Sequence, residues 1–292
     1  MVLLDGKKTS QELKEEIAAA VAVLRQQGKK VPHLAAVIVG NDGASLTYVS
    51  SKVKACEQVG FQSTLVKLPE DTSEDALLEK VKELNANADI DGYIVQLPLP
   101  KHIDEEKVLL AVDPKKDVDG FHPANFGRMA LELESFIPAT PYGIMQLLER
   151  YDIDTQGKHA IVIGRSHIVG RPISILLSQK GKYANATVTL AHSRTSDLKN
   201  LVLQADIVVS ALGIPNFVTA DMIKPGAVVV DVGITRVPDA DAPKGYRIVG
   251  DVDFDQVAPK TSFITPVPGG VGPMTIAMLL KNTLLARERS EV

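Results

Sequence analysis

The stretch Ile161-Val-Ile-Gly-Arg-Ser-His-Ile-Val-Gly-Arg-Pro172 decides the fold of the second half of the chain. The apolar run Ala160–Ile163 predicts a buried strand that ends at Gly164, and Gly170 precedes a helical pattern that opens near Pro172. Pro172 suits a first helical turn, where its missing N–H costs nothing. A strand, a glycine turn and a helix N-terminus present N–H groups and the positive end of the helix dipole, so this connection is typical of phosphate binding.

The same stretch departs from the common dinucleotide-binding fingerprint, G-x-G-x-x-G. Ser166 takes the place of the second glycine and Val169 that of the third, with Gly170 one position late. Taken by itself, the stretch fits a phosphate turn and an ordinary strand–turn–helix connection equally well.

Short apolar strands alternate with helical patterns along the whole chain. The expected strands are 34–39, 64–68, 92–97, 160–163, 187–191, 207–210 and 228–232. The expected helices are 9–27, 44–59, 73–85, 104–111, 141–151, 172–179, 197–203 and 273–287. This alternation predicts an α/β protein of two α/β domains, the second a doubly wound Rossmann-type parallel sheet. The turn-rich segment 137–141 marks the expected boundary.

Composition narrows the class of protein. The 292 residues are 45% hydrophobic and 23% charged, with a net charge of −4, which gives no sign of a nucleic-acid or anionic-membrane surface. Cys56 is the only cysteine, so no intrachain disulfide can form, which fits a reducing compartment. The apolar start at Val2–Leu4 is too short for a signal peptide, and the run 17–24 is too short for a membrane span. We expect a cytoplasmic protein without a membrane or nucleic-acid partner.

The residues after the strand 187–191 indicate which nicotinamide cofactor binds. An acid that binds the ribose of NAD is usual at this place, yet the chain has His192-Ser193-Arg194, with no carboxylate before Asp197. Serine and arginine would bind a 2′-phosphate, and Arg165 lies in the nearby turn. The pattern therefore favours NADP over NAD. The alternative is that both arginines are solvated surface charges.

The helix 44–59 carries Tyr48 and Lys52 on one face, because residues four apart are neighbours. The pattern alone favours a solvated lysine, which is the usual fate of this residue. The functional alternative is a partly desolvated amine with a lowered pKa, suited to act as a general base. Cys56 fits a small buried residue rather than a nucleophile.

Further polar residues follow the third strand. Gln96 could simply end that strand, or it could hold the amine of Lys52 by a hydrogen bond. Asp117 and Asp119 lie in the polar segment 115–122, separated by one residue. An aspartate here could bind the N–H and amino groups of a heterocycle, or the segment could be a charged turn. The sequence has no metal-ligand spacing, no P-loop and no nucleophile elbow.

Five segments carry a resemblance to a known family. They are Tyr48-Val-Ser-Ser-Lys52, Val95-Gln-Leu-Pro-Leu-Pro100, Lys116-Asp-Val-Asp-Gly-Phe-His-Pro123, Gly164-Arg-Ser-His-Ile-Val-Gly170 and Thr265-Pro-Val-Pro-Gly-Gly-Val-Gly-Pro-Met-Thr275. In this order they resemble the bifunctional methylenetetrahydrofolate dehydrogenase/methenyltetrahydrofolate cyclohydrolase family. The resemblance covers essentially the whole chain. It favours functional roles for Lys52, Gln96 and Asp119 over a solvated lysine, a simple strand end and a charged turn.

The resemblance implies two reactions and a set of site residues. A hydride would pass from 5,10-methylenetetrahydrofolate to NADP, and water would then open the methenyl product to 10-formyltetrahydrofolate. The implied catalytic residues are Lys52 as proton shuttle, Gln96 orienting it, Tyr48 stacking on the folate and Asp119 holding the pterin. Leu97 and the loop Pro268-Gly269-Gly270 would add substrate contacts. The cofactor would contact Gly164, Arg165, Ser166, Ser193, Ile234 and, by the charge argument above, Arg194.

The resemblance also implies an organisation for the chain. Residues 1–140 and 273–292 would form a discontinuous folate-binding catalytic domain, and residues 141–272 the NADP-binding domain, with the active-site cleft between them. The protein would be a homodimer that joins through the nucleotide-binding domain. Three alternatives stay open: a dehydrogenase with weak cyclohydrolase activity, a non-catalytic folate-binding protein, and an unrelated NADP oxidoreductase acting on a small hydroxy acid.

Overall fold

The protein is described by a computed structural model that covers residues 1–242 and 245–290. Its α-helices are α1 (Gly6–Gln26), α2 (Gly43–Val59), α3 (Glu74–Ala86), α4 (Glu105–Ala111), α5 (Pro123–Ala130), α6 (Ala139–Arg150), α7 (Gly170–Ser178), α8 (Leu198–Leu203), α9 (Phe254–Val257) and α10 (Val271–Arg289). Its strands are β1 (Val2–Leu3), β2 (His33–Val39), β3 (Gln62–Leu68), β4 (Gly92–Val95), β5 (His159–Ile163), β6 (Thr187–Ala191), β7 (Ile207–Ser210), β8 (Val228–Asp231), β9 (Thr235–Pro238), β10 (Tyr246–Val249) and β11 (Phe263–Ile264).

The chain divides into two compact units. Unit 1 comprises Met1–Ser10 and Thr140–Thr275, and unit 2 comprises Gln11–Ala139 and Ile276–Val292. Both units are discontinuous, because α1 and α10 each begin in unit 1 and continue into unit 2. The sequence-based expectation had grouped the first ten residues with 11–140.

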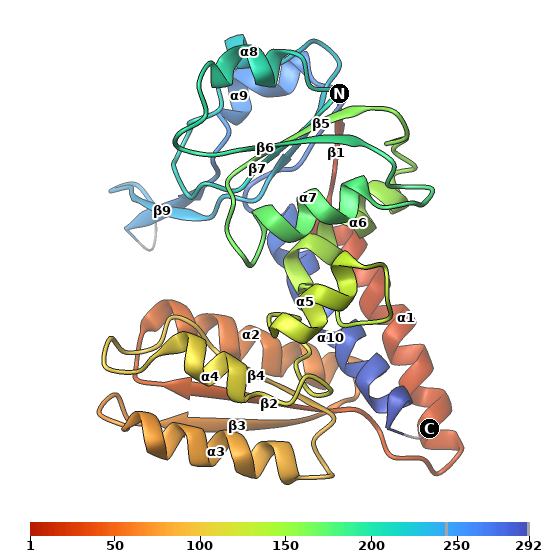
Figure 1. Cartoon of the computed structure of the whole chain (residues 1–292), viewed down its shortest axis with the longest axis vertical. Helices are drawn as coiled ribbons and strands as arrows, with labels where there is room; N and C mark the ends of the chain where they lie inside the picture. The colour runs from red at the N-terminus through yellow and green to blue at the C-terminus, as the bar shows by residue number, and fades with distance from the viewer. Residues whose placement is uncertain (243–244, 291–292) are drawn as a thin grey trace. The chain divides into compact units, whose positions relative to one another are not determined.

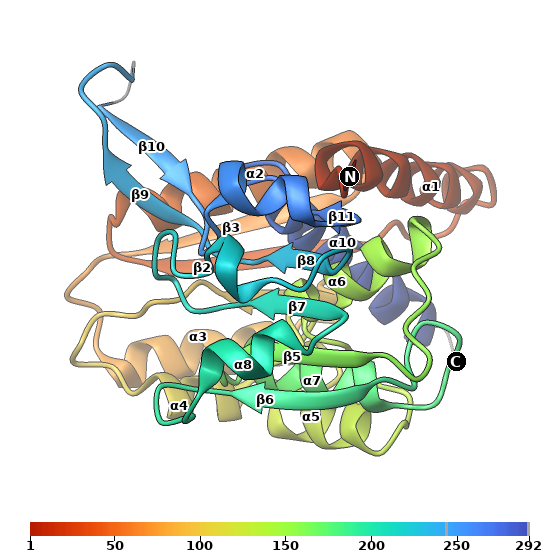
Figure 2. The same cartoon turned by 90° about the horizontal axis from the view of Figure 1, so that it is seen from above.

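Unit 1 is built on a parallel sheet of six strands in the order β1-β11-β8-β7-β5-β6. Figure 2 shows β8, β7, β5 and β6 side by side. The central strands are short runs of Val, Ile and Ala that are buried on both faces, as a covered parallel sheet requires. The predicted α/β class and the Rossmann-type sheet are confirmed.

A separate two-stranded antiparallel sheet, β9–β10, also belongs to unit 1. In Figure 2 this hairpin stands apart from the strands of the larger sheet. The polar stretch 238–245 includes the connection between these two strands. Residues 243 and 244 of that stretch lie outside the described residues.

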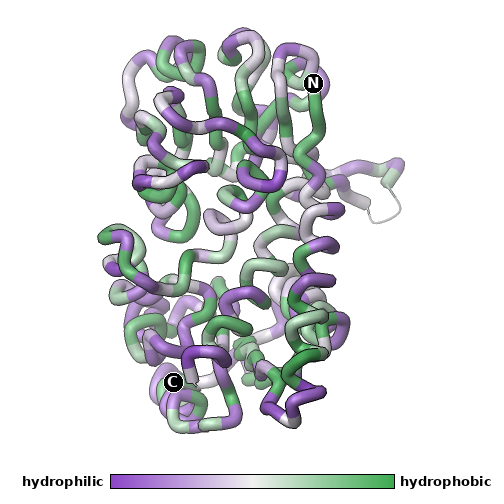
Figure 3. Tube along the Cα trace, turned by 90° about the vertical axis from the view of Figure 1, so that its right-hand side faces the viewer, coloured by the Kyte–Doolittle hydropathy of each residue, from purple (hydrophilic) through white to green (hydrophobic). Residues whose placement is uncertain are grey.

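Unit 2 contains a parallel sheet of three strands in the order β3-β2-β4. Ala35, Val37 and Val39 of β2 share a buried cluster with residues of α3 and α4, so these helices cover one face. Figure 1 shows α2 on the other side of the sheet from α3. Figure 3 shows hydrophobic stretches recurring between hydrophilic ones along the trace, as buried strands between half-exposed helices require.

Several short elements differ from expectation. Helix α5 was not predicted, because its eight residues include Gly127 and follow a turn-rich segment; His122 caps it by accepting a hydrogen bond from the N–H of Ala124. Strands β1 and β11 have two residues each and carry no usable pattern. Helix α6 begins at Ala139, two residues before its expected start. The hydroxyl of Thr140, in its first turn, lies 2.9 Å from the hydroxyl of Thr275.

Candidate functional site

Helix α2 carries the candidate catalytic lysine. Its N-terminus is capped by Asp42, whose carboxylate accepts a 2.8 Å hydrogen bond from the N–H of Ser45. Its C-terminus closes on Gly60, which has a left-handed φ of 79°. The helix therefore has the limits expected for 44–59, within one residue. The caps fix the helix that holds Lys52 at its middle.

Lys52 is buried, with only 8% of its surface exposed. Its Nζ donates a 3.1 Å hydrogen bond to Oε1 of Gln96, and Nε2 of Gln96 donates a 2.7 Å bond to the carbonyl of Leu97. Gln96 directly follows β4, and its N–H bonds to the carbonyl of Val37 on the neighbouring strand. The sheet therefore fixes the glutamine, and the glutamine fixes the amine.

Burial and charge act in opposite directions on this lysine. Desolvation lowers the pKa of Lys52, while the charge of Asp119 works to raise it. Burial likewise raises the pKa of Asp119, and Lys52 works to lower it. Because desolvation is the larger cause for both residues, each is shifted toward its neutral form. The solvated lysine favoured by the sequence pattern alone is wrong.

The loop that carries Asp119 is held in place by hydrogen bonds to Asp117, by close packing at Gly120 and by a hydrogen bond from Asn282. Asp117, one residue before Val118, accepts hydrogen bonds from the N–H groups of Phe121 (3.2 Å) and His122 (2.8 Å) and from the Asn125 side chain (2.9 Å). Gly120 has a φ of 73°, and a Cβ there would lie 2.7 Å from the nitrogen of Pro138. Asn282 of α10 donates to the carbonyl of Val118 at 2.8 Å.

Asp117 and Asn282 were not singled out for these roles from the sequence. Asp117 is buried and bonded to Asn125, whereas Asp119 interacts electrostatically with Lys52. Burial raises the pKa of Asp117 to about 6. For Asp117, the only signal in the sequence was that a second acid lies close to Asp119 in a polar segment.

Two other predicted residues flank the amine on α2. Tyr48 lies one turn before Lys52 and is 39% exposed, so its ring is accessible to a ligand. Cys56, one turn after Lys52, is buried, and burial raises the pKa of its thiol to about 12. A thiol with that pKa is not a nucleophile at neutral pH, as predicted.

The glycine turn after β5 has the close backbone packing that a phosphate cradle needs. Gly164 has a φ of 113°, and a Cβ there would collide with the carbonyl of Ala211. A Cβ on Gly170 would collide with the carbonyl of Gly164. Helix α7 begins at Gly170, two residues before the expected start, and the Ser166 hydroxyl accepts from the N–H groups of Val169 and Gly170. The turn thus packs the start of α7 closely against the end of β5, even without the usual glycine spacing.

Strand register brings the other predicted cofactor residues to the same sheet edge. Ile163 of β5 pairs with Ala191 of β6, so Arg165 and the pair Ser193–Arg194 follow adjacent strand ends. All three of these side chains are exposed. Ile234, three residues after β8, is 46% exposed.

The loop Pro268-Gly269-Gly270 precedes α10 in unit 1. The peptide bond between Val267 and Pro268 is cis, and Gly269 has a φ of 110°. A Cβ on Gly270 would lie 2.6 Å from the carbonyl oxygen of Pro266, and the carbonyl of Gly269 accepts a 2.9 Å bond from the N–H of Lys7. Only glycine fits this compact loop.

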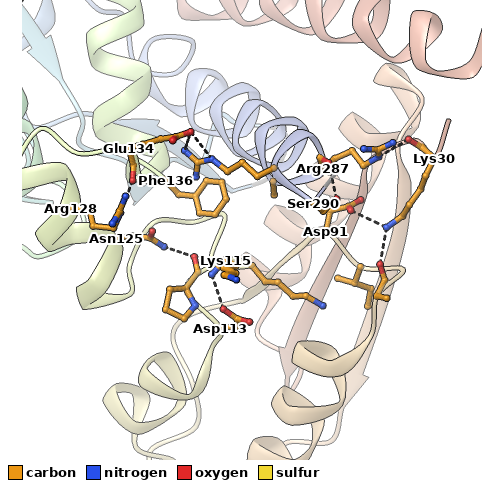
Figure 4. Close-up of a pocket in the computed structure, with 16 residues that line it drawn as sticks. Lys30, Asp91, Asp113, Lys115, Asn125, Arg128, Glu134, Phe136, Arg287 and Ser290 are labelled. Atoms are coloured by element: carbon orange, nitrogen blue, oxygen red, sulfur yellow. Dashed lines mark hydrogen bonds and ion pairs between the residues drawn. The ribbon is translucent and has the colours of Figure 1, made fainter. Parts of the chain in front are cut away.

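A large pocket lies elsewhere in unit 2 (Figure 4). Its volume is about 1000 Å³. It is lined by residues that precede β2 and β4, by residues 113–116, by α5 and the segment after it, and by the last turns of α10. Its charges are largely engaged within the protein: Lys30 pairs with Asp91, Arg289 with Glu134, and Arg128 with a carbonyl. None of the predicted site residues lines it.

No group of three or more His, Cys, Asp or Glu side chains in residues 1–242 and 245–290 could hold a metal ion. Within the same residues, no helix has the length and apolar character needed to cross a membrane.

Comparison with known proteins identifies the family. The model "Tetrahydrofolate dehydrogenase/cyclohydrolase, NAD(P)-binding domain" matches residues 138–291, and the model of the catalytic domain matches residues 4–119. The chain belongs to the tetrahydrofolate dehydrogenase/cyclohydrolase family. This membership confirms the predicted family, an enzyme with both activities, and a nicotinamide cofactor. It excludes an unrelated oxidoreductase.

Relatives of this family member match over their full lengths. "Bifunctional protein FolD" of Flavobacterium johnsoniae is 70% identical over 288 residues, covering 99% of this chain and 98% of that protein. The crystal structure of the bifunctional enzyme from Campylobacter jejuni is 47% identical, with a TM-score of 0.93 and 99% of each chain covered. The Trypanosoma brucei enzyme, solved with NADP and an inhibitor, is 40% identical, with a TM-score of 0.94 and 100% and 98% coverage.

Proposed function

We propose that Lys52 is the general base of the cyclohydrolase reaction in this dehydrogenase/cyclohydrolase, and that Gln96 holds its amine in place. The observation that carries this proposal is the buried Nζ of Lys52, bonded at 3.1 Å to a neutral amide oxygen. A neutral partner directs the amine without stabilising its charged form. A lysine base must be unprotonated, and desolvation shifts the pKa of Lys52 in that direction.

The chemistry of the second step suits this arrangement. The methenyl carbon is already electrophilic, so a metal or a covalent nucleophile is not needed. As water attacks that carbon, the neutral amine of Lys52 takes a proton from the water. The ammonium can return a proton to the folate N5 as the N5–carbon bond breaks, and the carbon becomes the formyl group. One proton is released to solvent over the whole step.

Tyr48 and Asp119 would bind the folate around this amine. Tyr48 offers an exposed aromatic ring one helical turn from Lys52, which suits stacking against a flat pterin. Asp119 lies close enough to Lys52 for their charges to interact, and a carboxylate there can accept hydrogen bonds from the pterin edge. Leu97 and the compact loop 268–270 are further substrate contacts in this proposal. The proposal also includes a discontinuous folate-binding domain made of residues 1–140 and 273–292.

The first step requires NADP, which supplies the hydride acceptor when it is bound. Gly164, Arg165 and Ser166 would hold its phosphates at the start of α7, and Ile234 would contact it from the end of β8. Ser193 and Arg194 would bind the 2′-phosphate, since they follow the strand end adjacent to the phosphate turn. The exposed positions of Arg165 and Arg194 leave both guanidinium groups accessible to a ligand.

The cofactor assignment is tested by following wild-type protein and Arg194→Ala with methylenetetrahydrofolate and either NADP⁺ or NAD⁺. The wild type should form both reduced cofactor and the 10-formyl product, with NADP⁺ preferred. Loss of one charge-assisted contact should weaken NADP⁺ use by about 10-fold or more and leave NAD⁺ use unchanged. Equal use of both cofactors by the wild type would contradict the assignment, and accumulation of methenyl product would indicate a dehydrogenase with weak cyclohydrolase activity.

We also infer that the enzyme is a homodimer joined through unit 1. The β9–β10 ribbon forms a sheet of its own, and a two-stranded ribbon is marginally stable in water unless it packs against another surface. A second copy of the chain would provide that surface, and sedimentation velocity distinguishes a dimer from a monomer.

A further inference from the structure

Two buried carboxylates in unit 1 have no part in the reactions described above. Asp251 is fully buried and Asp231, the last residue of β8, is 3% exposed. Carboxylates buried this deeply are costly unless their oxygens are bonded. Their hydrogen bonds therefore show what they hold in place.

Asp251 binds the loop that follows β7. Its Oδ2 accepts from the N–H of Leu212 at 2.6 Å and from the hydroxyl of Ser210 at 3.2 Å. Its Oδ1 accepts from the N–H of Ile214 at 2.9 Å. Both oxygens thus fix one loop, residues 211–214, at the carboxyl end of the sheet.

Asp231 links Asp251 to the loop that follows β8. It accepts 2.9 Å bonds from the N–H groups of Gly233, Asp251 and Val252. A Cβ on Gly233 would collide with Asp251, and a Cβ on Gly250 would collide with Asp231. Asp231, Gly233, Gly250 and Asp251 therefore form one closely packed cluster, the carboxylate cluster, which leaves no room for a side chain at either glycine.

Both loops held by this carboxylate cluster adjoin residues that are proposed to bind the cofactor. The carbonyl of Ala211, next to Leu212, is the group on which Gly164 of the phosphate turn packs. Ile234 directly follows Gly233 in the loop after β8. Asp251 contacts one loop directly and, through Asp231, is tied to the other.

We propose that Asp251 is a positioning residue for the dehydrogenase reaction: its carboxylate fixes the loop after β7 in the shape that the nicotinamide cofactor binds, beside the loop after β8 that Asp231 holds. The inference rests on the proposed cofactor site around Gly164 and Ile234. Asn is nearly the same size as Asp but presents one NH₂ group, which cannot accept a hydrogen bond from the backbone N–H groups that face it. Asp251→Asn should therefore release the loop after β7, whereas the bond from the backbone N–H of residue 251 to Asp231 is kept.

The bifunctional enzyme supplies its own control, because hydrolysis of added methenyltetrahydrofolate consumes no nicotinamide cofactor. We expect Asp251→Asn to raise the KM for NADP⁺ at least tenfold, with the KM for methylenetetrahydrofolate and the cyclohydrolase kcat within twofold of the wild type. Asp255→Asn, an exposed acid four residues away, should leave all of these values unchanged.

An unchanged KM for NADP⁺, or a parallel loss of both activities, would overturn the proposal. If Asp251→Asn does not fold, Ser210→Ala removes one of the three donors to Asp251 and should raise the KM for NADP⁺ by a smaller factor, again without affecting hydrolysis; no effect on that KM would also overturn it. A wild-type protein without NADP⁺-dependent oxidation would instead contradict the proposed cofactor site itself.

Discussion

Lys52 shows how far residue-level inference reaches. Its position four residues after Tyr48 is visible in the sequence, but spacing alone favoured a solvated lysine, since most lysines are exposed. Its partners Gln96 and Asp119 lie 44 and 67 positions further along the chain, and periodicity within one helix carries no information about them. The family resemblance indicated the role, and the structure gives its physical basis.

The neutral character of Gln96 can be tested by pH. Gln96→Glu would place a carboxylate beside the amine, and a negative neighbour raises a lysine pKa because it favours the charged form. The pH at which cyclohydrolase activity reaches half its maximum should therefore move upward relative to the wild type. Activity at neutral pH should fall, because less of Lys52 is unprotonated. A pH–rate profile of methenyltetrahydrofolate hydrolysis, corrected for the uncatalysed reaction, measures this shift; an unmoved or lowered midpoint would count against the role of Gln96.

Asp117 makes a second pH prediction at the residue scale. Burial raises its pKa from 3.8 to about 6, so the folded state binds a proton more tightly than the unfolded state. The stabilisation from the protonated acid is full below pH 3.8 and is lost as the pH rises to about 6. Relative to Asp117→Asn, the free energy of unfolding of the wild type should thus fall by about 2–3 kcal/mol across this window. Urea denaturation of both proteins at pH 4.5 and 7 measures this difference in the free energy of unfolding. A wild type that becomes more stable relative to the variant as the pH rises would refute the prediction.

At the scale of elements, length decided what the sequence could predict. Strands β2, β5, β6 and β7 and helices α2, α3 and α10 have enough residues to show a period, and all were expected within a few residues of their limits. The two-residue strands β1 and β11 have no period at all. Helix α5 is short and contains Gly127, and its cap is His122 rather than one of the usual cap residues.

The phosphate turn makes the prediction that belongs to this scale. Gly170→Ala would add a methyl group against the carbonyl of Gly164, so the turn must shift and dehydrogenase activity should fall at least 10-fold. Gly127→Ala makes the same change in α5, where the added carbon meets open space. It should stabilise the protein by about 0.5–1 kcal/mol and leave both activities intact. Equal activities of the two variants would show that the turn does not need glycine at position 170.

At the scale of the whole molecule, the fold places the two sets of predicted residues in different compact units. Lys52, Gln96 and Asp119 belong to unit 2, whereas Gly164, Ser193 and Ile234 belong to unit 1. The sequence could predict both sheets, because each consists of buried apolar strands separated by helices. It could not show that Asp231 and Asp251 hold the loops of unit 1, because most of their partners are backbone N–H groups whose positions no sequence pattern specifies.

The central claim is that Lys52 is the base that hydrolyses the methenyl group, and its most direct test is the rate of that step alone. Methenyltetrahydrofolate would be mixed with wild type, Lys52→Ala or Lys54→Ala; Lys54 is an exposed lysine on the same helix. Loss of a general base should slow catalysed hydrolysis about 10²-fold or more in Lys52→Ala, with Lys54→Ala unchanged. Full cyclohydrolase activity in Lys52→Ala would contradict the account.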